Sequence, residues 1–387
     1  MKVALSAIGK FHTFDLAREL LARGALAGIH TGYPRFKLKA EGIPQELIHT
    51  LPWTQGAYMG FPWKHCLSAT AIQNWENFNA NAFGNWVGRN LPDSDVYVGL
   101  SGSSLLAGKS AQAHGGKYVC DRGSAHIRFQ DQLLREEHTL WDIPYIGIDP
   151  RAIAREVAEY AQADCITVPS GFVRQSFLDQ GVDGAKLRIL PYGVNLSRFH
   201  PTAAPDPTRY DVLFVGGMSL RKGVQYLVQA YQKLQHPAKS LTFVGAPSPE
   251  LMDTLKARRL WPTDARVLGH MPQPELKNIM SRSHVMVLPS IEEGLAMVQA
   301  QAMACACPVI ASANTGSQDL FANGREGWTV SIRDVHALAD RMQHLADNPS
   351  ERDAMGQLAL QKVSGLGGWS DYGDRAISIY RELALHA

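Results

Sequence analysis

Short apolar runs alternate with amphipathic stretches along the chain, and a turn signal follows each run. The first run, Lys2 to Ile8, is broken by Gly9 and leads into Phe14 to Arg23, where apolar residues recur at helical spacing. Runs of the same kind follow at Val96 to Gly99, Tyr118 to Cys120 and Cys165 to Val168. This alternation predicts a first α/β domain that ends near Pro191.

A proline-rich connection over residues 200–211 (HPTAAPDPTRYD) separates this domain from a second series of apolar runs. The series begins at Val212 to Val215, followed by Gly216-Gly217 and a helical pattern from about Gly223. Later runs are Leu241 to Val244, Arg266 to Leu268, His284 to Leu288 and Val309 to Ala311. We therefore predict a second α/β domain with about six parallel strands.

The chain ends in a predicted amphipathic helix, Trp369 to Leu385, which lies beyond a glycine-rich break. We expect this helix to pack back across the domain boundary. The predicted divisions are residues 1–192 for the first domain, 193–365 for the second, and 366–387 for the helix on the first domain.

Composition narrows the classes of function. A length of 387 residues fits two domains, and a net charge of +2 without a basic run argues against nucleic acid as a partner. The five cysteines lack paired metal-ligand spacing, which indicates a reducing cytoplasm and no structural zinc. The opening MKVALSAIG is strand-like, so we expect a cytoplasmic protein without a secretory signal.

An acidic pair precedes a long uncharged stretch in the second domain. No charged residue occurs between Glu293 and Asp319, which predicts a long buried helix and a buried strand. Glu293 and Gly294 then lie at the carboxyl end of a strand, where α/β sheets bind ligands, and before a helix N-terminus that favours anions. The alternative is that Glu292 and Glu293 only complement the helix dipole.

Residues 49–92 are unusually rich in aromatic side chains. Such clusters most often fill a core, but aromatic faces also suit sugar rings and membrane interfaces. Both interpretations stay open here, and the second implies at most a weak peripheral contact with the inner face of a membrane. The aromatic residues are Trp53, Tyr58, Phe61, Trp63, Trp75, Phe78, Phe83 and Trp86.

Four separated segments carry one further pattern. They are residues 161–201, with Ser170 and Pro191-Tyr192-Gly193-Val194; residues 214–231 (FVGGMSLRKGVQYLVQAY); residues 289–310; and residues 327–334 (GWTVSIRD). Together they resemble the retaining GT-B glycosyltransferases of family 4, the group 1 glycosyltransferases. The resemblance covers most of residues 150–345. It implies two facing Rossmann-like domains, a nucleotide-sugar held mainly by the second and an acceptor held by the first.

The resemblance gives Lys222 the central catalytic role. A leaving diphosphate gains negative charge as the glycosidic bond breaks, and Lys222 stands just beyond Gly216-Gly217, where the backbone can approach phosphate closely. The family commonly has arginine where Gly217 stands, and Arg221 is the candidate for supplying the missing guanidinium. The plain alternative is that Arg221 and Lys222 belong to a solvated turn.

The same resemblance assigns the remaining donor contacts. Glu293 is expected to accept hydrogen bonds from sugar hydroxyls, and His270 to help shape the pocket. Gln301 takes the place of the family's second glutamate and is expected to bind ribose, without the charge-assisted part of that interaction. The backbone N–H groups expected to meet phosphate are those of Gly294, Leu295, Ala296 and Met297.

The first domain contributes His126 and Lys10 to the predicted site. By resemblance, His126 touches the donor sugar near the reacting centre, although an isolated helix histidine is more often structural. Lys10 follows Gly9 after the first strand and is a candidate to approach the diphosphate from the opposite domain; the alternative is an exposed loop lysine. Asp121 and Arg122, which follow a strand, are secondary candidates. Asp93-Ser94-Asp95 precedes a strand instead of following one, so we do not interpret it as a metal site, and we expect no metal or cofactor.

The function implied by the resemblance is transfer of a sugar, with retention of anomeric configuration, from a UDP-, GDP- or ADP-linked donor. The acceptor hydroxyl would belong to a carbohydrate, a lipid-linked molecule or a small molecule. Two alternatives stay open: a nucleotide-sugar epimerase of the same architecture, and a non-catalytic nucleotide-sugar-binding subunit. Gly217 and Gln301, which depart from the family's pattern, motivate the second alternative.

Overall fold

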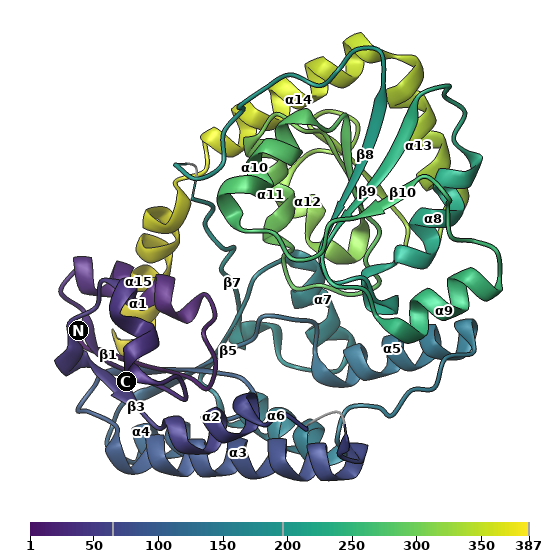
Figure 1. Cartoon of the computed structure of the whole chain (residues 1–387). Coiled ribbons are helices and arrows are strands. Elements are labelled where there is room, and N and C mark those ends of the chain that lie inside the picture. Colours follow the sequence, from purple (N-terminus) through teal and green to yellow (C-terminus); the bar gives the residue numbers. More distant parts are fainter. Residues whose placement is uncertain (64–65, 196, 386–387) are drawn as a thin grey trace.

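The chain forms two parallel α/β domains joined at one interface (Figure 1). The computed structural model describes residues 1–63, 66–195 and 197–385. The first sheet has seven strands in the order β3-β2-β1-β4-β5-β6-β7, and the second has six in the order β10-β9-β8-β11-β12-β13. Every pairing within these sheets is parallel. The predicted fold class is confirmed.

The strands of the first sheet are β1 Val3–Ala7, β2 Leu26–Thr31, β3 Ile48–Thr50, β4 Val96–Leu100, β5 Lys117–Asp121, β6 Cys165–Val168 and β7 Leu187–Ile189. Its helices are α1 Thr13–Ala22, α2 Pro52–Gly60, α3 Ala69–Asn90, α4 Leu105–Ala113, α5 Ile127–Trp141, α6 Pro150–Gln162 and α7 Gly171–Asp179. Short 3-10 turns are η1 Arg35–Glu41, η2 Gln45–Leu47 and η4 Gly184–Lys186. The apolar pattern predicted β1, β4, β5 and β6 but missed β2, β3 and β7.

The strands of the second sheet are β8 Tyr210–Val215, β9 Lys239–Val244, β10 Ala265–Val267, β11 Val285–Leu288, β12 Val309–Ser312 and β13 Gly327–Val330. Its helices are α8 Val224–Lys233, α9 Pro249–Ala257, α10 Gln273–Arg282, α11 Met297–Ala304, α12 Ser317–Leu320, α13 Val335–Asp347 and α14 Pro349–Ser364, with 3-10 turns η5 Leu220–Lys222 and η6 Ala313–Thr315. Apolar runs predicted the first five strands, and β13 falls within residues 327–334, a segment singled out by the family resemblance.

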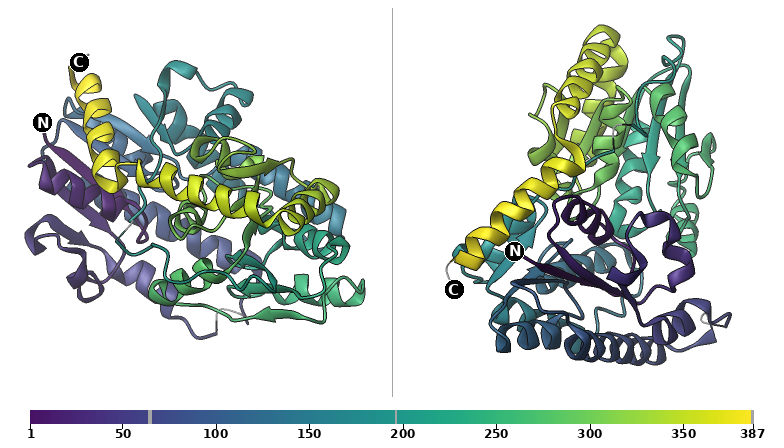
Figure 2. Two further views of the ribbon diagram at one scale, coloured as in Figure 1. Left: turned by 90° about the horizontal axis from the view of Figure 1, so that it is seen from above. Right: turned by 90° about the vertical axis from the view of Figure 1, so that its left-hand side faces the viewer.

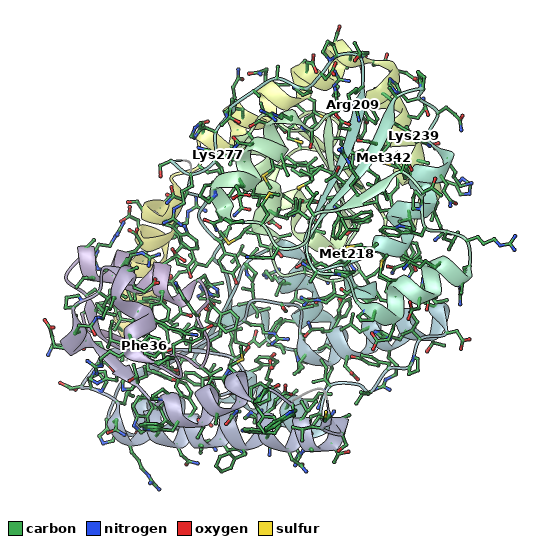
Figure 3. The ribbon with its side chains drawn as sticks, viewed as in Figure 1. Phe36, Arg209, Met218, Lys239, Lys277 and Met342 are labelled. Atoms are coloured by element: carbon green, nitrogen blue, oxygen red, sulfur yellow. The ribbon has the colours of Figure 1, made fainter. Side chains whose placement is uncertain are left out.

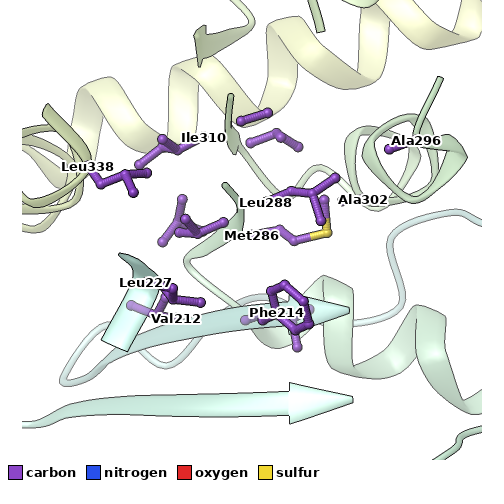
Figure 4. Close-up of a cluster of buried hydrophobic side chains, with 14 of the residues drawn as sticks. Val212, Phe214, Leu227, Met286, Leu288, Ala296, Ala302, Ile310 and Leu338 are labelled. Carbon is purple, nitrogen blue, oxygen red and sulfur yellow. The ribbon is translucent and has the colours of Figure 1, made fainter. Parts of the chain in front are cut away.

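The core of the second domain lies between its sheet and the helices on both faces. Figure 4 shows Val212 and Phe214 of β8 and Met286 and Leu288 of β11 among these side chains. Leu227 of α8 also belongs to this core. β11 and the part of β8 from Val212 onward are covered on both faces, which accounts for their continuous apolar runs without alternation.

The last helix, α15 Gly368–Leu385, leaves the second domain and packs on the first (Figure 2). Tyr372, Ala376 and Tyr380 are buried in the first domain's core. Asp374 accepts a hydrogen bond of 2.8 Å from Arg23, near the end of α1. The predicted crossing-back of the terminal helix is therefore part of the fold, whereas the exact domain boundaries stay predictions. Among the described helices, none is both long enough and apolar enough to span a membrane.

Candidate functional site

The two sheets present their carboxyl ends to each other, and the predicted site lies where they meet. The loop after β5 contacts the loop after β11, since a Cβ atom on Gly294 would lie 1.8 Å from the carbonyl oxygen of Gly123. After β6, the Ser170 hydroxyl donates a 2.6 Å hydrogen bond to the carbonyl oxygen of Gly294. The N–H of Gly171 donates to Asp319 at 2.9 Å. Ligands of α/β sheets bind at such edges.

The glycine loop after β8 opens the site in the second domain. Gly216 has a φ of 149°, and a Cβ atom there would approach the Cε atom of Lys222 to 3.8 Å. A Cβ atom on Gly217 would meet no atom within 4 Å, so a side chain could start at this position without a clash. Figure 3 shows Met218, the next residue, on the side of the second domain that faces the first.

Lys222 and Glu293 meet directly at this edge. The Lys222 ammonium forms an ion pair with the Glu293 carboxylate, and the Ser290 hydroxyl donates to the same carboxylate at 3.1 Å. The Glu293 side chain is largely buried, whereas Lys222 keeps partial access to solvent. Gly223 has a φ of 70° and packs so tightly on Pro289 that a Cβ atom would lie 1.9 Å from the Pro289 carbonyl oxygen. This contact fixes the start of α8 against the end of β11.

Arg221 is paired with Glu292, next to the Lys222 pair. The Arg221 Nε atom donates to the Glu292 carboxylate at 2.9 Å and to the Glu292 carbonyl at 3.2 Å. Part of the guanidinium is therefore engaged within the protein. Its side chain also borders an interdomain cavity of about 490 Å³ that includes Tyr145 and Ser248. The expectation that Arg221 replaces the missing arginine at the diphosphate stays a prediction.

Glu292 makes an interdomain contact that the sequence analysis missed. Its side chain is fully buried, and it accepts hydrogen bonds from the Ala125 N–H at 2.9 Å and from the Gln130 amide at 2.9 Å. Both donors belong to the first domain. Glu292 therefore connects the two domains in addition to pairing with Arg221, which corrects the alternative that it only complements a helix dipole. The adjacent glutamates gave the only sequence signal for this contact.

The helix after the Glu293 loop is shorter than predicted. The helix α11 has eight residues and starts at Met297. The N–H of Ala296 donates to the Thr315 carbonyl at 3.1 Å, so it is not free for phosphate as expected. Leu295 and Ala296 are buried, and Met297 is half-buried.

Gln301 lies on α11 with its side chain half-exposed, as a nucleotide contact requires. Gln299, two residues earlier, is instead buried and donates to the Thr315 carbonyl at 2.9 Å. The two glutamines of this helix thus differ. Gln299 bonds the helix to the η6 turn, whereas the half-exposed Gln301 side chain does not take part in that bond.

The structure corrects the expectation that His126 faces the cleft. Its side chain is 2% exposed and packs between Tyr160 and Phe177, with ring centroids 5.0 Å apart in both cases. The His126 Nδ1 atom accepts the Arg128 N–H at 3.3 Å and so caps α5. Burial, with Arg122 and Arg128 nearby, lowers the pKa of His126 to about 4. This histidine is held neutral inside the first domain.

Lys10 and His270 lie at the carboxyl ends of β1 and β10. The Lys10 ammonium forms an ion pair with Glu41 of its own domain, so in this conformation it does not reach toward the second domain as expected. Glu41 also pairs with Arg18 at 2.9 Å. His270 follows Gly269 and is exposed, consistent with a place at the rim of the site.

A second pair that the sequence did not reveal lies beside Gly123. The His12 Nε2 atom is 2.5 Å from the Asp121 carboxylate, and the His12 ring lies 4.3 Å from the Tyr192 ring. The other Asp121 oxygen accepts the Thr167 hydroxyl at 2.9 Å. Sequence reasoning singled out Asp121 but had no way to pair it with His12, because the two are 109 residues apart.

Arg122, the other secondary candidate, is turned inward. It is buried, lies 2.7 Å from Glu156 and donates to the Ala125 carbonyl at 3.0 Å. Its hydrogen bond to Ala125 therefore stabilises the loop that contains Gly123 and contacts the second domain. In the described part of the chain, no group of three or more histidine, cysteine or acidic side chains is arranged to hold a metal ion.

Comparison with known proteins extends this geometry. Residues 198–362 match the family described as glycosyl transferases group 1. The D-inositol 3-phosphate glycosyltransferase 1 of Catenulispora acidiphila is 30% identical over 254 residues, which are 60% of this chain and 60% of that protein. The glycogen synthase of Mycobacterium tuberculosis is 27% identical over 202 residues, 51% of this chain and 48% of that protein. The chain thus spans about half to three fifths of these relatives' lengths.

Solved structures match over the whole chain. The sucrose-phosphate synthase of Thermosynechococcus elongatus has a TM-score of 0.76 at 21% identity and covers 100% of both chains. The Anabaena HepE structure with UDP and glucose has a TM-score of 0.70 at 13% identity, covering 99% of this chain and 100% of that one. At such identities the similarity establishes the GT-B fold. The family match over residues 198–362 lies within the second domain of this fold, which is therefore similar to glycosyl transferases group 1.

Proposed function

We propose that the protein is a retaining glycosyltransferase that moves a sugar from a UDP-, GDP- or ADP-linked donor to an acceptor hydroxyl. The observation that carries this proposal is the contact of Lys222 with Glu293 beside the Gly216-Gly217 loop, at the edge where the second sheet meets the first. A cation, a carboxylate and a close-approach backbone stand together at the position where an α/β sheet holds its ligand.

In the proposed reaction, the donor diphosphate enters beside Lys222 and displaces part of its ion pair with Glu293. The Lys222 ammonium stabilises the charge that grows on the leaving phosphate oxygen, and Glu293 accepts hydrogen bonds from sugar hydroxyls. The bond from the anomeric carbon to phosphate breaks, and a bond to the acceptor oxygen forms on the same face. The acceptor proton passes to the leaving phosphate. Lys222 supplies the positive charge, so we propose that no divalent ion is required.

The contacts between the domains would also exclude water from the proposed donor site. Glu292 and Gly294, on either side of Glu293 in the chain, both contact the first domain. A closed interface limits hydrolysis of the donor by water. The acceptor, a carbohydrate, a lipid-linked molecule or a small molecule, would enter from the first domain.

The direct test incubates the full chain with a panel of nucleotide-sugars and acceptors and follows the products by NMR. UDP-glucose is the first donor to test, since a HepE structure of the same fold was determined with it. We expect a new glycoside with the donor's anomeric configuration and an unchanged rate in the presence of a chelator. Formation of an epimeric sugar without any acceptor would instead establish an epimerase. Binding without turnover in every combination would establish a binding subunit.

A further inference from the structure

One surface of the first domain exposes several large apolar side chains. We call it the apolar face; it consists of η1 and α2. Trp53 is 82% exposed, Phe36 67% and Met59 63%. Figure 3 shows Phe36 on the first domain. Monomeric proteins rarely gather such side chains in one place without a partner.

The structure refines the two interpretations of residues 49–92. Tyr58 and Phe83 are buried, so part of this aromatic cluster fills the core. Trp53 and Met59 on α2 point to solvent, and Phe36, outside the predicted window, joins them. The exposed set is therefore a surface made by two elements, η1 and α2, that come together only in the fold.

The apolar face borders a hollow of about 860 Å³ at the carboxyl ends of β2 and β3. Phe36, Trp53 and Met59 line this hollow, together with Tyr33. The carboxyl ends of β2 and β5 lie on one edge of the sheet, because all strands are parallel. The apolar face thus lies on the same edge of the first sheet as Gly123, which contacts Gly294 of the second domain.

The charges of η1 suit an anionic partner. Lys37 and Lys39 are exposed, and neither has an ion pair within the described residues. The acidic residue of the same turn, Glu41, is buried and already paired with Lys10 and Arg18. The face therefore presents free cations beside tryptophan, phenylalanine and methionine. This combination is typical of segments that sit at a lipid-water interface, where aromatic rings lie at headgroup level and lysines meet anionic headgroups.

We propose that the apolar face docks the protein on an anionic lipid bilayer, with Trp53, Phe36 and Met59 inserted at the interface and Lys37 and Lys39 on the headgroups. A second copy of the chain is a poorer occupant, since a two-fold contact would bring Lys37 and Lys39 close to their own copies. Docking would hold the acceptor edge of the first domain at the membrane. It goes beyond the proposed transfer reaction and does not depend on it.

The test is flotation of the full chain with vesicles of phosphatidylcholine alone or with phosphatidylglycerol, without any nucleotide-sugar. We expect binding to the anionic vesicles that weakens as salt is raised. The triple variant Phe36→Ser, Trp53→Ser, Met59→Ser should lower the partition coefficient at least about tenfold, since these side chains bury apolar area only on docking. Lys37→Glu with Lys39→Glu should lower it by a similar factor.

Two matched controls stand elsewhere on the chain. Leu140→Ser removes another exposed apolar side chain, and Lys233→Glu with Lys256→Glu reverses two exposed lysines of the second domain. Both should bind vesicles like the parent, and all variants should keep its melting temperature. Failure of the parent to float, or equal binding by the triple variant and the controls, would overturn the proposal. So would a parent dimer that the triple variant converts to monomers, because the face would then be a contact between copies.

Discussion

At the scale of single residues, the proposed donor site departs from the family's pattern at Gly217 and Gln301. The space at Gly217 is open, and the Gln301 side chain is half-exposed on α11. In the described part of the chain, packing around these two positions does not require glycine at 217 or glutamine at 301. If the proposed donor site is correct, we expect these two departures to change the strength of nucleotide binding more than its location.

Gln301→Glu should strengthen nucleotide binding. A carboxylate accepts hydrogen bonds from a ribose diol with charge assistance that a neutral amide lacks, and the gain is about 1 kcal/mol, or roughly fivefold in Kd. Isothermal titration with UDP and GDP measures the change.

Inorganic pyrophosphate is the matched control ligand, because it has no ribose. Its Kd should stay the same in Gln301→Glu or rise slightly through charge repulsion. If pyrophosphate and the nucleotides gained affinity to the same extent, Gln301 would not be the ribose contact.

Other residue roles could not be read from sequence because they depend on packing over long separations. His126 follows a strand, as a cleft residue would, yet its ring fills a space between Tyr160 and Phe177. His12 and Asp121 pair only because β1 and β5 end at the same edge of the sheet. A local pattern specifies the edge on which a residue lies but not the direction of its side chain.

At the scale of elements, the contact between the Glu292 loop and the start of α5 ties the domains together. Glu292 is buried and has three partners, Ala125, Gln130 and Arg221. Removing the charge leaves Arg221 without its carboxylate. Glu292→Gln should therefore lower the free energy of unfolding by about 2–3 kcal/mol, measured by urea denaturation.

A double-mutant cycle separates the ion pair from the interdomain contacts. Arg221→Gln and the double variant Arg221→Gln, Glu292→Gln complete the cycle. We expect a coupling energy of about 1 kcal/mol or more, because Arg221 is partly screened by solvent. Strictly additive losses would mean that Arg221 and Glu292 do not stabilise each other.

The elements themselves were largely predictable where they are long apolar runs. Five of the six strands of the second sheet follow from apolar runs, with the three-residue β10 marked by the glycine that follows it. The strands β3 and β7 also have only three residues each, too few to show a period. The strand β2 contains Gly28 and His30, which weaken its apolar signal. The α11 helix was predicted too long because its uncharged sequence continues through the loop and into β12.

At the scale of the whole molecule, two connections fix how the domains face each other. The helix α15 buries Tyr372 and Tyr380 in the first domain's core. At the opposite side of the boundary, the Gly294 loop packs on Gly123 with no space for a side chain. The sequence predicted the first connection from an amphipathic pattern, and it could not predict the second, since contact between two loops leaves no periodic trace.

Gly294→Ala should therefore open the interface. Its Cβ atom would collide with the Gly123 carbonyl oxygen, which is backbone and cannot move aside alone. We expect a larger radius of gyration by small-angle X-ray scattering. The turnover number should also fall by about tenfold or more, because the catalytic geometry depends on closure.

Gly365→Ala is the matched control, since its Cβ atom would have ordinary contacts at 3.5 Å or more. It should keep the parent's scattering profile and turnover. An unchanged radius of gyration in Gly294→Ala would indicate that the loops separate readily and do not limit closure.

The central claim is that Lys222 stabilises the leaving diphosphate beside Glu293. The most direct test is the turnover number of Lys222→Ala, with the Kd of the nucleotide-sugar measured on the same protein and Lys233→Ala as an exposed control on the neighbouring helix. We predict that kcat falls about 10²–10³-fold, at least as much as donor affinity, with an unchanged fold. A near-normal kcat in Lys222→Ala would contradict the account.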